Sequence, residues 1–131
     1  MSKRKTVIPK AMQPMYDQFH FAPAVRVGKH VFCSGQLGNG PDGMLDPDPS
    51  VQFSQAFENV QTVLKEAGAK MSDVVELTTF HIGFHEHIGV FMQVKDGYIK
   101  EKYPAWTAIG VSELAFPGAL VEIKARAIIK K

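Results

Sequence analysis

The chain has 131 residues, 45% of them hydrophobic and 21% charged, with a formal net charge of +2, which fits one domain with one core. This charge is too small to indicate binding to nucleic acid or to an anionic membrane, and no apolar run is long enough to span a bilayer. The start lacks the apolar core of a signal peptide, and the single cysteine, Cys33, excludes an internal disulfide, so we expect a cytoplasmic protein.

The N-terminal part predicts a lead-in followed by a β-hairpin. Residues 1–15 show no clear hydrophobic period and are expected to form an extended lead-in to a single domain that spans residues 1–131. Aromatic residues then begin at Tyr16. Strand-like residues at 25–34, interrupted by a Gly-Lys turn, predict the hairpin. Gly35 follows directly, and a glycine at a strand end often lets a ligand or another backbone approach closely.

Residues 51–67 give the clearest helix. Asp48 or Ser50 is suited to cap its start, and Gly68 to end it. Polar residues, Gln52 among them, fill the side opposite the apolar stripe. The stripe is expected to face the core and has the 3.6-residue period of a helix; its members are Phe53, Ala56, Phe57, Val60, Val63, Leu64 and Ala67.

The C-terminal half predicts a strand, a helix and two more strands. β-Branched and aromatic residues at 74–82 favour a strand, and a second helix is expected over about 87–102. Its inner face has Ile88, Phe91, Val94 or Lys95, and Tyr98. Strands at 104–111 and 119–129 complete the order β-β-α-β-α-β-β. This order predicts an α+β fold with a single mixed sheet and two helices on one face.

The last strand carries one charged residue that needs an explanation. Residues 119–129 alternate, so Ala119, Val121 and Ile123 lie on one face and Glu122 lies on the other. Glu122 shares its face with Lys124 and Arg126. Two interpretations stay open: a solvated structural carboxylate, or a functional one.

The second face of the sheet has no predicted element to cover it. Phe80, Ile82, Leu120 and Ile128 are expected there. A sheet with apolar residues on both faces and helices on only one is typical of a protein that associates. We therefore expect a homo-oligomer.

The histidines and the single cysteine raise two further possibilities, a metal site and a nucleophile. His81, His85 and His87, with Glu86 between them, match no strong metal-ligand spacing, so we expect surface histidines and no bound metal. Cys33 is expected to be a buried small hydrophobic residue and not a nucleophile.

Several motifs, in order, resemble the RidA/YjgF family from about Tyr16 to the C-terminus. They are Val31-Phe-Cys-Ser-Gly-Gln-Leu37, Ala56-Phe-Glu-Asn-Val60, Leu64-Lys-Glu-Ala-Gly-Ala69, Ser72-Asp-Val-Val75, Tyr103-Pro-Ala-Trp-Thr-Ala108 and Ala119-Leu-Val-Glu-Ile123. The resemblance implies a chorismate-mutase-like α+β fold and a homotrimer with a small-molecule cleft at each subunit interface. It also implies hydrolysis of 2-imino or enamino acids without a metal or an organic cofactor.

The resemblance assigns site residues one by one. Glu122 matches the carboxylate that orients or activates water. The expected ligand-binding positions are Tyr16, Ser34, Gly35, Phe91, Lys95, Trp106 and Ala108. The Ser34-Gly35 strand end is expected to offer backbone donors.

Three of these positions depart from the imine-deaminase branch. Trp106 stands where that branch has an arginine that binds the substrate carboxylate, Ala108 where it often has cysteine, and Lys95 where it has asparagine. These changes predict a deaminase or hydrolase with a shifted substrate. The alternative is a trimeric metabolite-binding protein without catalysis. An endoribonuclease is a further alternative, although the small net charge makes a nucleic-acid partner unexpected.

Overall fold

The computed structural model describes residues 3–130, which form one six-stranded sheet. The strands lie in the order β1-β2-β3-β6-β4-β5. They are β1 (Arg4–Val7), β2 (Ala24–Val27), β3 (His30–Cys33), β4 (Val74–His81), β5 (Ala105–Gly110) and β6 (Val121–Ile128). β4 and β5 run parallel, and the other neighbours are antiparallel. The mixed sheet of the prediction is confirmed.

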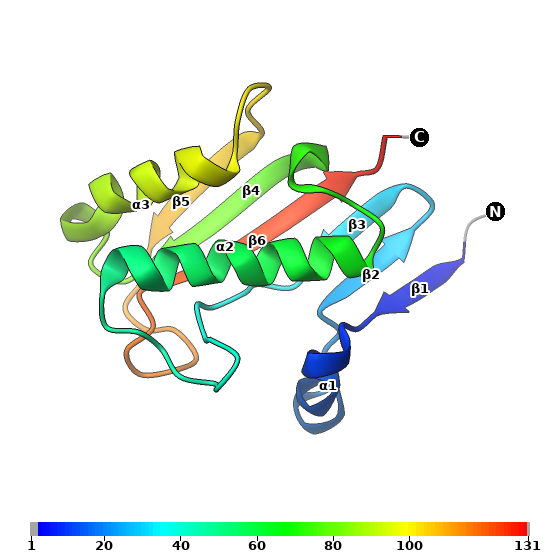
Figure 1. The fold of residues 1–131 in the computed structure, drawn as a ribbon, viewed down its shortest axis with the longest axis horizontal. Helices are drawn as coiled ribbons and strands as arrows, with labels where there is room; N and C mark the ends of the chain where they lie inside the picture. Colours follow the sequence, from blue (N-terminus) through cyan, green and yellow to red (C-terminus); the bar gives the residue numbers. More distant parts are fainter. Residues whose placement is uncertain (1–2, 131) are drawn as a thin grey trace.

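Helices cover one face of this sheet (Figure 1). α2 (Pro49–Glu66) and α3 (Phe84–Tyr98) lie side by side across it, while α1 (Gln13–Phe19) lies at the end of the β1–β2 pair. Short 3₁₀ turns span Lys10–Met12 and Met71–Asp73. The core lies between the sheet and α2 and α3, so the α+β fold with two helices on one face is confirmed. No helix within residues 3–130 is long and apolar enough to cross a membrane.

The expectation of an extended lead-in over residues 1–15 is wrong for residues 10–15, which are helical, whereas β1 is extended but belongs to the sheet. Residues 1–2 lie outside the described part of the chain. After them β1 pairs with β2, and residues 10–19 are helical. Local patterns gave no sign of this because β1 has one buried residue, Val7, and α1 has none. Neither segment therefore carries the apolar period that reveals a strand or a helix.

α2 follows the sequence closely. Its N-cap is Asp48, whose side chain accepts a hydrogen bond from the Ser50 amide at 2.9 Å, and Pro49 occupies the first turn. All seven residues of the expected stripe are buried. Gly68 follows the helix with a φ of +88°, a conformation that costs glycine little.

α3 begins and ends about three residues earlier than expected. Gly83, with a φ of +64°, precedes it, and Ile99 turns to an extended conformation after Tyr98. Ile99 is buried in the core. The predicted end at Lys102 came from the helix-breaking effect of Pro104, whereas the packing of Ile99 ends the helix first.

Gln52 is a buried polar residue that the sequence placed on the exposed side of α2. Its Nε2 donates to the carbonyl groups of Asp46 and Gly118 at 3.0 and 3.1 Å, and its Oε1 accepts from the Leu120 amide at 2.6 Å. One side chain thus holds the loop before α2 against the turn before β6. Buried amides remain in proteins when such partners satisfy them.

Replacing Gln52 by leucine should therefore destabilise the fold. Gln52→Leu leaves three backbone groups without their partner, and we expect a loss of about 3 kcal/mol or more in the free energy of unfolding. Urea unfolding followed by circular dichroism measures it. Gln61→Leu makes the same change at an exposed position of α2 and should change stability little. Equal effects of both variants would contradict the role of Gln52.

Candidate functional site

The sheet face that the helices leave open carries Glu122. On β6 the helix-facing residues Val121 and Ile123 are fully buried, while Glu122 is half-buried on the other side. Lys124 and Arg126 share its face, as predicted. Apolar residues also lie on this face: Phe80 is half-buried, and Phe32, Ile109 and Ile128 are 40%, 40% and 39% exposed. Within residues 3–130, no helix covers them.

Glu122 is held against Gly35. A Cβ atom built on Gly35 would stand 2.1 Å from Oε2 of Glu122 and 2.6 Å from its Cδ, so no other residue fits there without displacing the carboxylate. The next residue, Gln36, exchanges two backbone hydrogen bonds with Ile123, at 2.8 and 2.9 Å. The close approach expected at this glycine therefore exists, and the group that approaches is the side chain of Glu122.

Ser34 has a structural task. Its Oγ donates to the Ala22 carbonyl at 2.6 Å, and its amide donates to the Pro23 carbonyl at 2.9 Å. The Ser34 amide is therefore occupied within the protomer, and the expectation of backbone donors at the Ser34-Gly35 strand end now rests on the Gly35 amide. The two bonds tie the segment after α1 to the strand end that carries Gly35.

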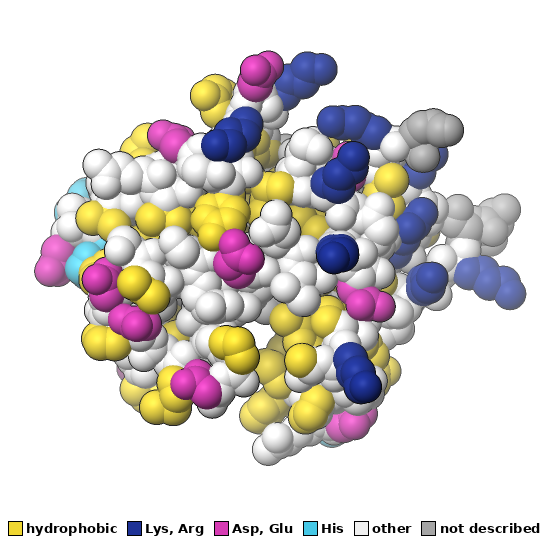
Figure 2. Space-filling view, in the orientation of Figure 1, with side chains coloured by type: hydrophobic (Ala, Val, Ile, Leu, Met, Phe, Trp, Pro, Cys, Tyr) yellow, Lys and Arg dark blue, Asp and Glu magenta, His cyan; other side chains and the backbone are white. Residues whose placement is uncertain are grey.

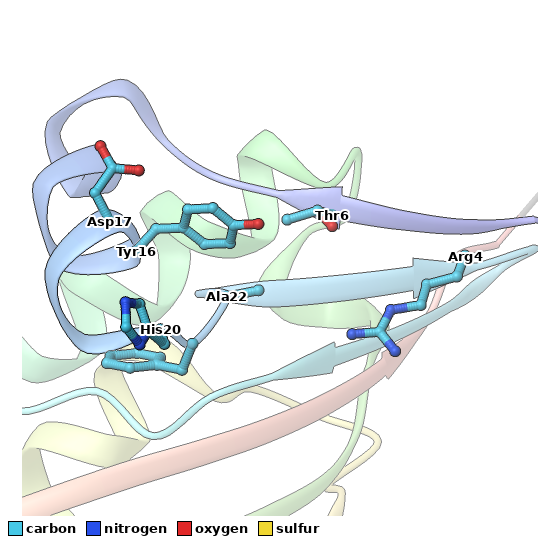
Figure 3. A pocket seen from close by; sticks show the side chains of 7 residues that line it. Arg4, Thr6, Tyr16, Asp17, His20 and Ala22 are labelled. Carbon is cyan, nitrogen blue, oxygen red and sulfur yellow. The ribbon is translucent and has the colours of Figure 1, made fainter.

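A pocket of about 470 Å³ lies on the other side of that segment (Figure 3). Its lining residues are Arg4, Thr6, Tyr16, Asp17, His20, Phe21 and Ala22. Tyr16, on α1, directs its hydroxyl toward Thr6 of β1. Because Ala22 both lines the pocket and accepts from Ser34, the pocket adjoins the Gly35 segment. Ser34, Gly35 and Glu122 thus form one connected group, here called the open-face group, while Tyr16 lies in the pocket that adjoins this group through Ala22.

The other four expected positions lie on the opposite face of the sheet, beneath α3. On β5, Trp106 pairs with Leu77 and Ala108 pairs with Thr79, and both β4 partners are buried on the helix side. Phe91 of α3 packs 6.1 Å from the Trp106 ring. Phe91, Lys95, Trp106 and Ala108 are here called the α3-face group. One protomer does not bring the two groups together.

Lys95 places a positive charge beside Trp106. Its side chain is 7% exposed, and its Nζ lies 4.5 Å from the centroid of the Trp106 ring and 5.9 Å from that of Tyr103. No carboxylate of the described residues lies within ion-pair distance of it. The ring faces therefore hold this charge, through cation–π attraction, and they keep it on the α3 side of the sheet.

A buried polar chain fixes the indole ring. Trp106 Nε1 donates to Thr79 Oγ1 at 2.9 Å, and the same oxygen lies 2.7 Å from Nε2 of His81. His81 is 1% exposed, and its Nδ1 has no hydrogen-bond partner within residues 3–130. Burial lowers the pKa of His81 to about 4, so it is neutral near pH 7.

The prediction that the histidines lie at the surface is thus wrong for His81. His85 is exposed and His87 half-buried. In the described part of the chain, no three His, Cys, Asp or Glu side chains form a group that could hold a metal. Cys33 is buried, and burial raises its pKa to about 12, which confirms the expected packing role.

Figure 2 shows the surface of the molecule on the side of α2 and α3. A row of hydrophobic side chains lies between the two helices. Below the surface, the Phe57 ring stacks on that of Tyr98 with centroids 5.0 Å apart and on that of Phe91 at 5.6 Å. The Lys and Arg side chains gather mostly toward the end that carries the termini.

Enlarging Gly35 should disturb Glu122 directly. Gly35→Ala forces the flexible, half-exposed end of the Glu122 side chain to move, so we expect a loss of no more than about 1 kcal/mol in the free energy of unfolding. Gly89→Ala is the matched control, because a Cβ atom there meets nothing within 4 Å and favours the helix by about 0.5–1 kcal/mol. Urea unfolding of both variants measures this. A Gly35→Ala variant that gains as much stability as Gly89→Ala would show that the carboxylate does not occupy the space beside Gly35.

Buried His81 should make stability depend on pH. Since its pKa falls from 6.5 to about 4 on folding, the unfolded chain binds more protons than the native one between these values. Stability is therefore complete above pH 6.5 and falls by up to about 3 kcal/mol as the pH drops toward 4. His81→Gln should flatten this part of the profile, whereas His85→Gln should not. Parallel profiles for wild type and His81→Gln would refute the assignment.

Comparison with known proteins agrees with this fold. A family model described as Endoribonuclease L-PSP matches residues 12–129. The RutC family protein YjgH of Escherichia coli (strain K12) is 35% identical over 116 residues, which are 88% of each chain. The 2-iminobutanoate/2-iminopropanoate deaminase of Dermatophagoides farinae is 33% identical over 130 residues, 98% of each chain.

A solved structure of protein YJGH superposes on this chain with a TM-score of 0.87 at 35% identity, and the match covers 98% of both chains. The family model spans most of the chain, and the fold agrees along nearly its whole length. The chain therefore belongs to the RidA/YjgF family, whose model is described as Endoribonuclease L-PSP.

Proposed function

We propose that this protein hydrolyses imine- or enamine-type metabolites, with Glu122 as the general base for the attacking water. The observation that carries the proposal is the carboxylate of Glu122, which lies against Gly35 on a sheet face that is otherwise rich in uncovered apolar residues. A carboxylate in partly apolar surroundings suits proton transfer. The deaminase name of a relative 33% identical over 98% of both chains supports the same chemistry.

The reaction needs one water and one group that moves a proton. Glu122 takes a proton from water as the oxygen bonds to the imine carbon, and the C=N electron pair moves to nitrogen. Glu122 gives this proton to the nitrogen, so that a neutral carbinolamine forms. It then takes the proton of the carbinolamine hydroxyl as the carbonyl forms and passes it to the nitrogen, so that the C–N bond breaks and ammonia leaves. An enamine must first gain a proton at carbon. The sum is imine plus water giving a carbonyl compound plus ammonia, with no redox step.

The cleft for this reaction forms between two copies of the chain. Glu122 and Trp106 lie on opposite faces of one sheet, so one protomer does not present both to one ligand. A homotrimer in which the open face of one copy meets the β5 edge of the next joins the open-face group to the α3-face group. It also covers the exposed side chains of Phe32, Ile109 and Ile128.

The substrate is shifted toward a ligand with an apolar part. In the imine-deaminase branch an arginine stands at the position of Trp106, and an indole offers a flat apolar wall in place of a guanidinium fork. Lys95 over this ring adds a positive charge without the fork geometry. We therefore expect lower activity on small, polar imino acids than on imines with an apolar side chain.

Two alternatives remain as outcomes of the tests. Without hydrolysis, the same trimeric cleft is a binding site for a small metabolite. An endoribonuclease has the support of the family description, while the net charge of +2 provides little attraction for RNA.

Removing the carboxylate should abolish turnover and leave the fold intact. With imines generated by an amino-acid oxidase, Glu122→Gln should lower kcat by about 10²–10⁴-fold, because glutamine keeps the shape beside Gly35 but does not accept the proton. Trp106→Arg should shift preference toward small imino acids. An inactive wild type with an active Trp106→Arg variant would favour the binding protein, whereas a fully active Glu122→Gln would refute the catalytic role.

Mixing variants tests whether two copies share the cleft. Trp106→Ser removes the ring but keeps a side chain that can donate to Thr79. If each cleft takes Glu122 from one copy and Trp106 from the next, co-refolding Glu122→Gln with Trp106→Ser should regenerate intact clefts and recover activity. Light scattering should give the mass of a trimer in every case. A monomer mass, or no recovery in the mixture, would contradict the shared cleft.

A further inference from the structure

Lys95 is a cation that the fold buries without giving it an opposite charge. Its side chain is 7% exposed, and within residues 3–130 it takes part in no ion pair. A charge that leaves water unpaired costs free energy, so a lysine is rarely found in such a position. The two aromatic rings beside it offset part of this cost through cation–π attraction. The position therefore suits a residue that is kept for a negatively charged ligand.

The tip of Lys95 lies where its cluster meets solvent. Nζ lies 4.5 Å from the centroid of the Trp106 ring and 5.9 Å from that of Tyr103. Tyr103 is 73% exposed and Trp106 is half-buried, so the rings that hold the ammonium also form part of the surface. Tyr103 belongs to the segment between α3 and β5, which projects from the end of both elements (Figure 1). An anion can therefore approach Nζ from outside, beside these two rings.

The cluster suits a carboxylate with an apolar body. An ammonium group has three N–H donors. Two ring faces lie near this one, so at least one donor stays free for an oxygen atom of a ligand. The indole and phenol rings offer flat apolar surface next to it. The indole is held in place, because its Nε1 donates to Thr79 Oγ1 at 2.9 Å. One cation beside such walls fits a single negative charge better than a dianion such as a phosphate ester.

We propose that Lys95 is the specificity-determining cation of this protein and binds the carboxylate of its ligand, with the rings of Trp106 and Tyr103 against the apolar part. This inference rests on the proposed function in one respect: it takes the ligand to be the imine substrate, which is then an imino acid. Lys95, Trp106 and Tyr103 belong to one protomer and lie together around Nζ. The carboxylate site therefore does not depend on where Glu122 lies.

The fluorescence of the protein tests the inference without any need for turnover. Trp106 is the single tryptophan of the chain, so its emission reports binding at this cluster. Isovalerate and isovaleramide have nearly the same shape, neither absorbs where tryptophan does, and only the first is charged. In titrations of the assembled protein, we expect isovalerate to change the Trp106 emission at millimolar concentration and to bind at least tenfold more tightly than isovaleramide. Lys95→Met should weaken isovalerate at least tenfold and leave isovaleramide within twofold.

Two further lysine variants are the controls. Lys95→Arg keeps a cation that can lie on the indole ring, and it should keep the affinity for isovalerate within about fivefold. Lys100→Met makes the same change as Lys95→Met at an exposed position just after α3, and it should leave this affinity within twofold. The inference is overturned if isovalerate does not change the emission at millimolar concentration, or if it binds to Lys95→Met as tightly as to wild type.

Unfolding by urea separates a binding role from a structural one. If Lys95 is kept for a ligand, Lys95→Met removes a buried charge and should raise the urea midpoint of the free protein while it weakens isovalerate. If the contacts with the two rings are its whole purpose, the same variant should unfold at a lower urea concentration. A lowered midpoint with unchanged affinity for isovalerate would assign Lys95 to packing.

The hydrolysis assay separates this inference from the proposed function. If wild type does not hydrolyse imines while isovalerate binding depends on Lys95, the reaction is wrong and the carboxylate site stands. If Glu122→Gln is inactive while Lys95→Met keeps the KM of wild type for imino acids, the reaction stands and the role of Lys95 is refuted. A raised KM with little change in kcat in Lys95→Met supports both.

Discussion

The contact between Gly35 and the Glu122 carboxylate is the constraint around which the candidate site is arranged. It requires a residue without a side chain just after β3, while the alternation of β6 places the carboxylate on the open face of that strand. The hydrogen bonds between Gln36 and Ile123 hold this geometry. Those of Ser34 extend it to the segment after α1, and through Ala22 to the pocket that contains Tyr16.

The sheet itself divides the chemistry of this chain. Thr79 and His81 hold Trp106 beneath α3, where Lys95 lies over the indole ring. The carboxylate lies on the other side of the same layer. A strand separates its two faces because successive side chains point in opposite directions. The proposed reaction needs both Glu122 and Trp106 in one cleft and therefore needs two copies of the chain. The same association would cover the apolar side chains of the open face.

Sequence alone determined those parts of this protein that depend on the local spacing of apolar residues. The stripe of α2, the alternation of β6 and the position of Glu122 on a face without a helix all follow from the spacing of apolar residues. Tertiary structure decided the rest. β1 and α1 bury too few residues to show a hydrophobic period. His81 and Gln52 are polar residues that the fold buries, and their spacing in the sequence does not reveal this burial. Gln52 donates a hydrogen bond to Gly118, Trp106 donates one to Thr79, and Gly35 contacts Glu122. Folding brings these distant segments together, and no local sequence pattern indicates which segments will pair.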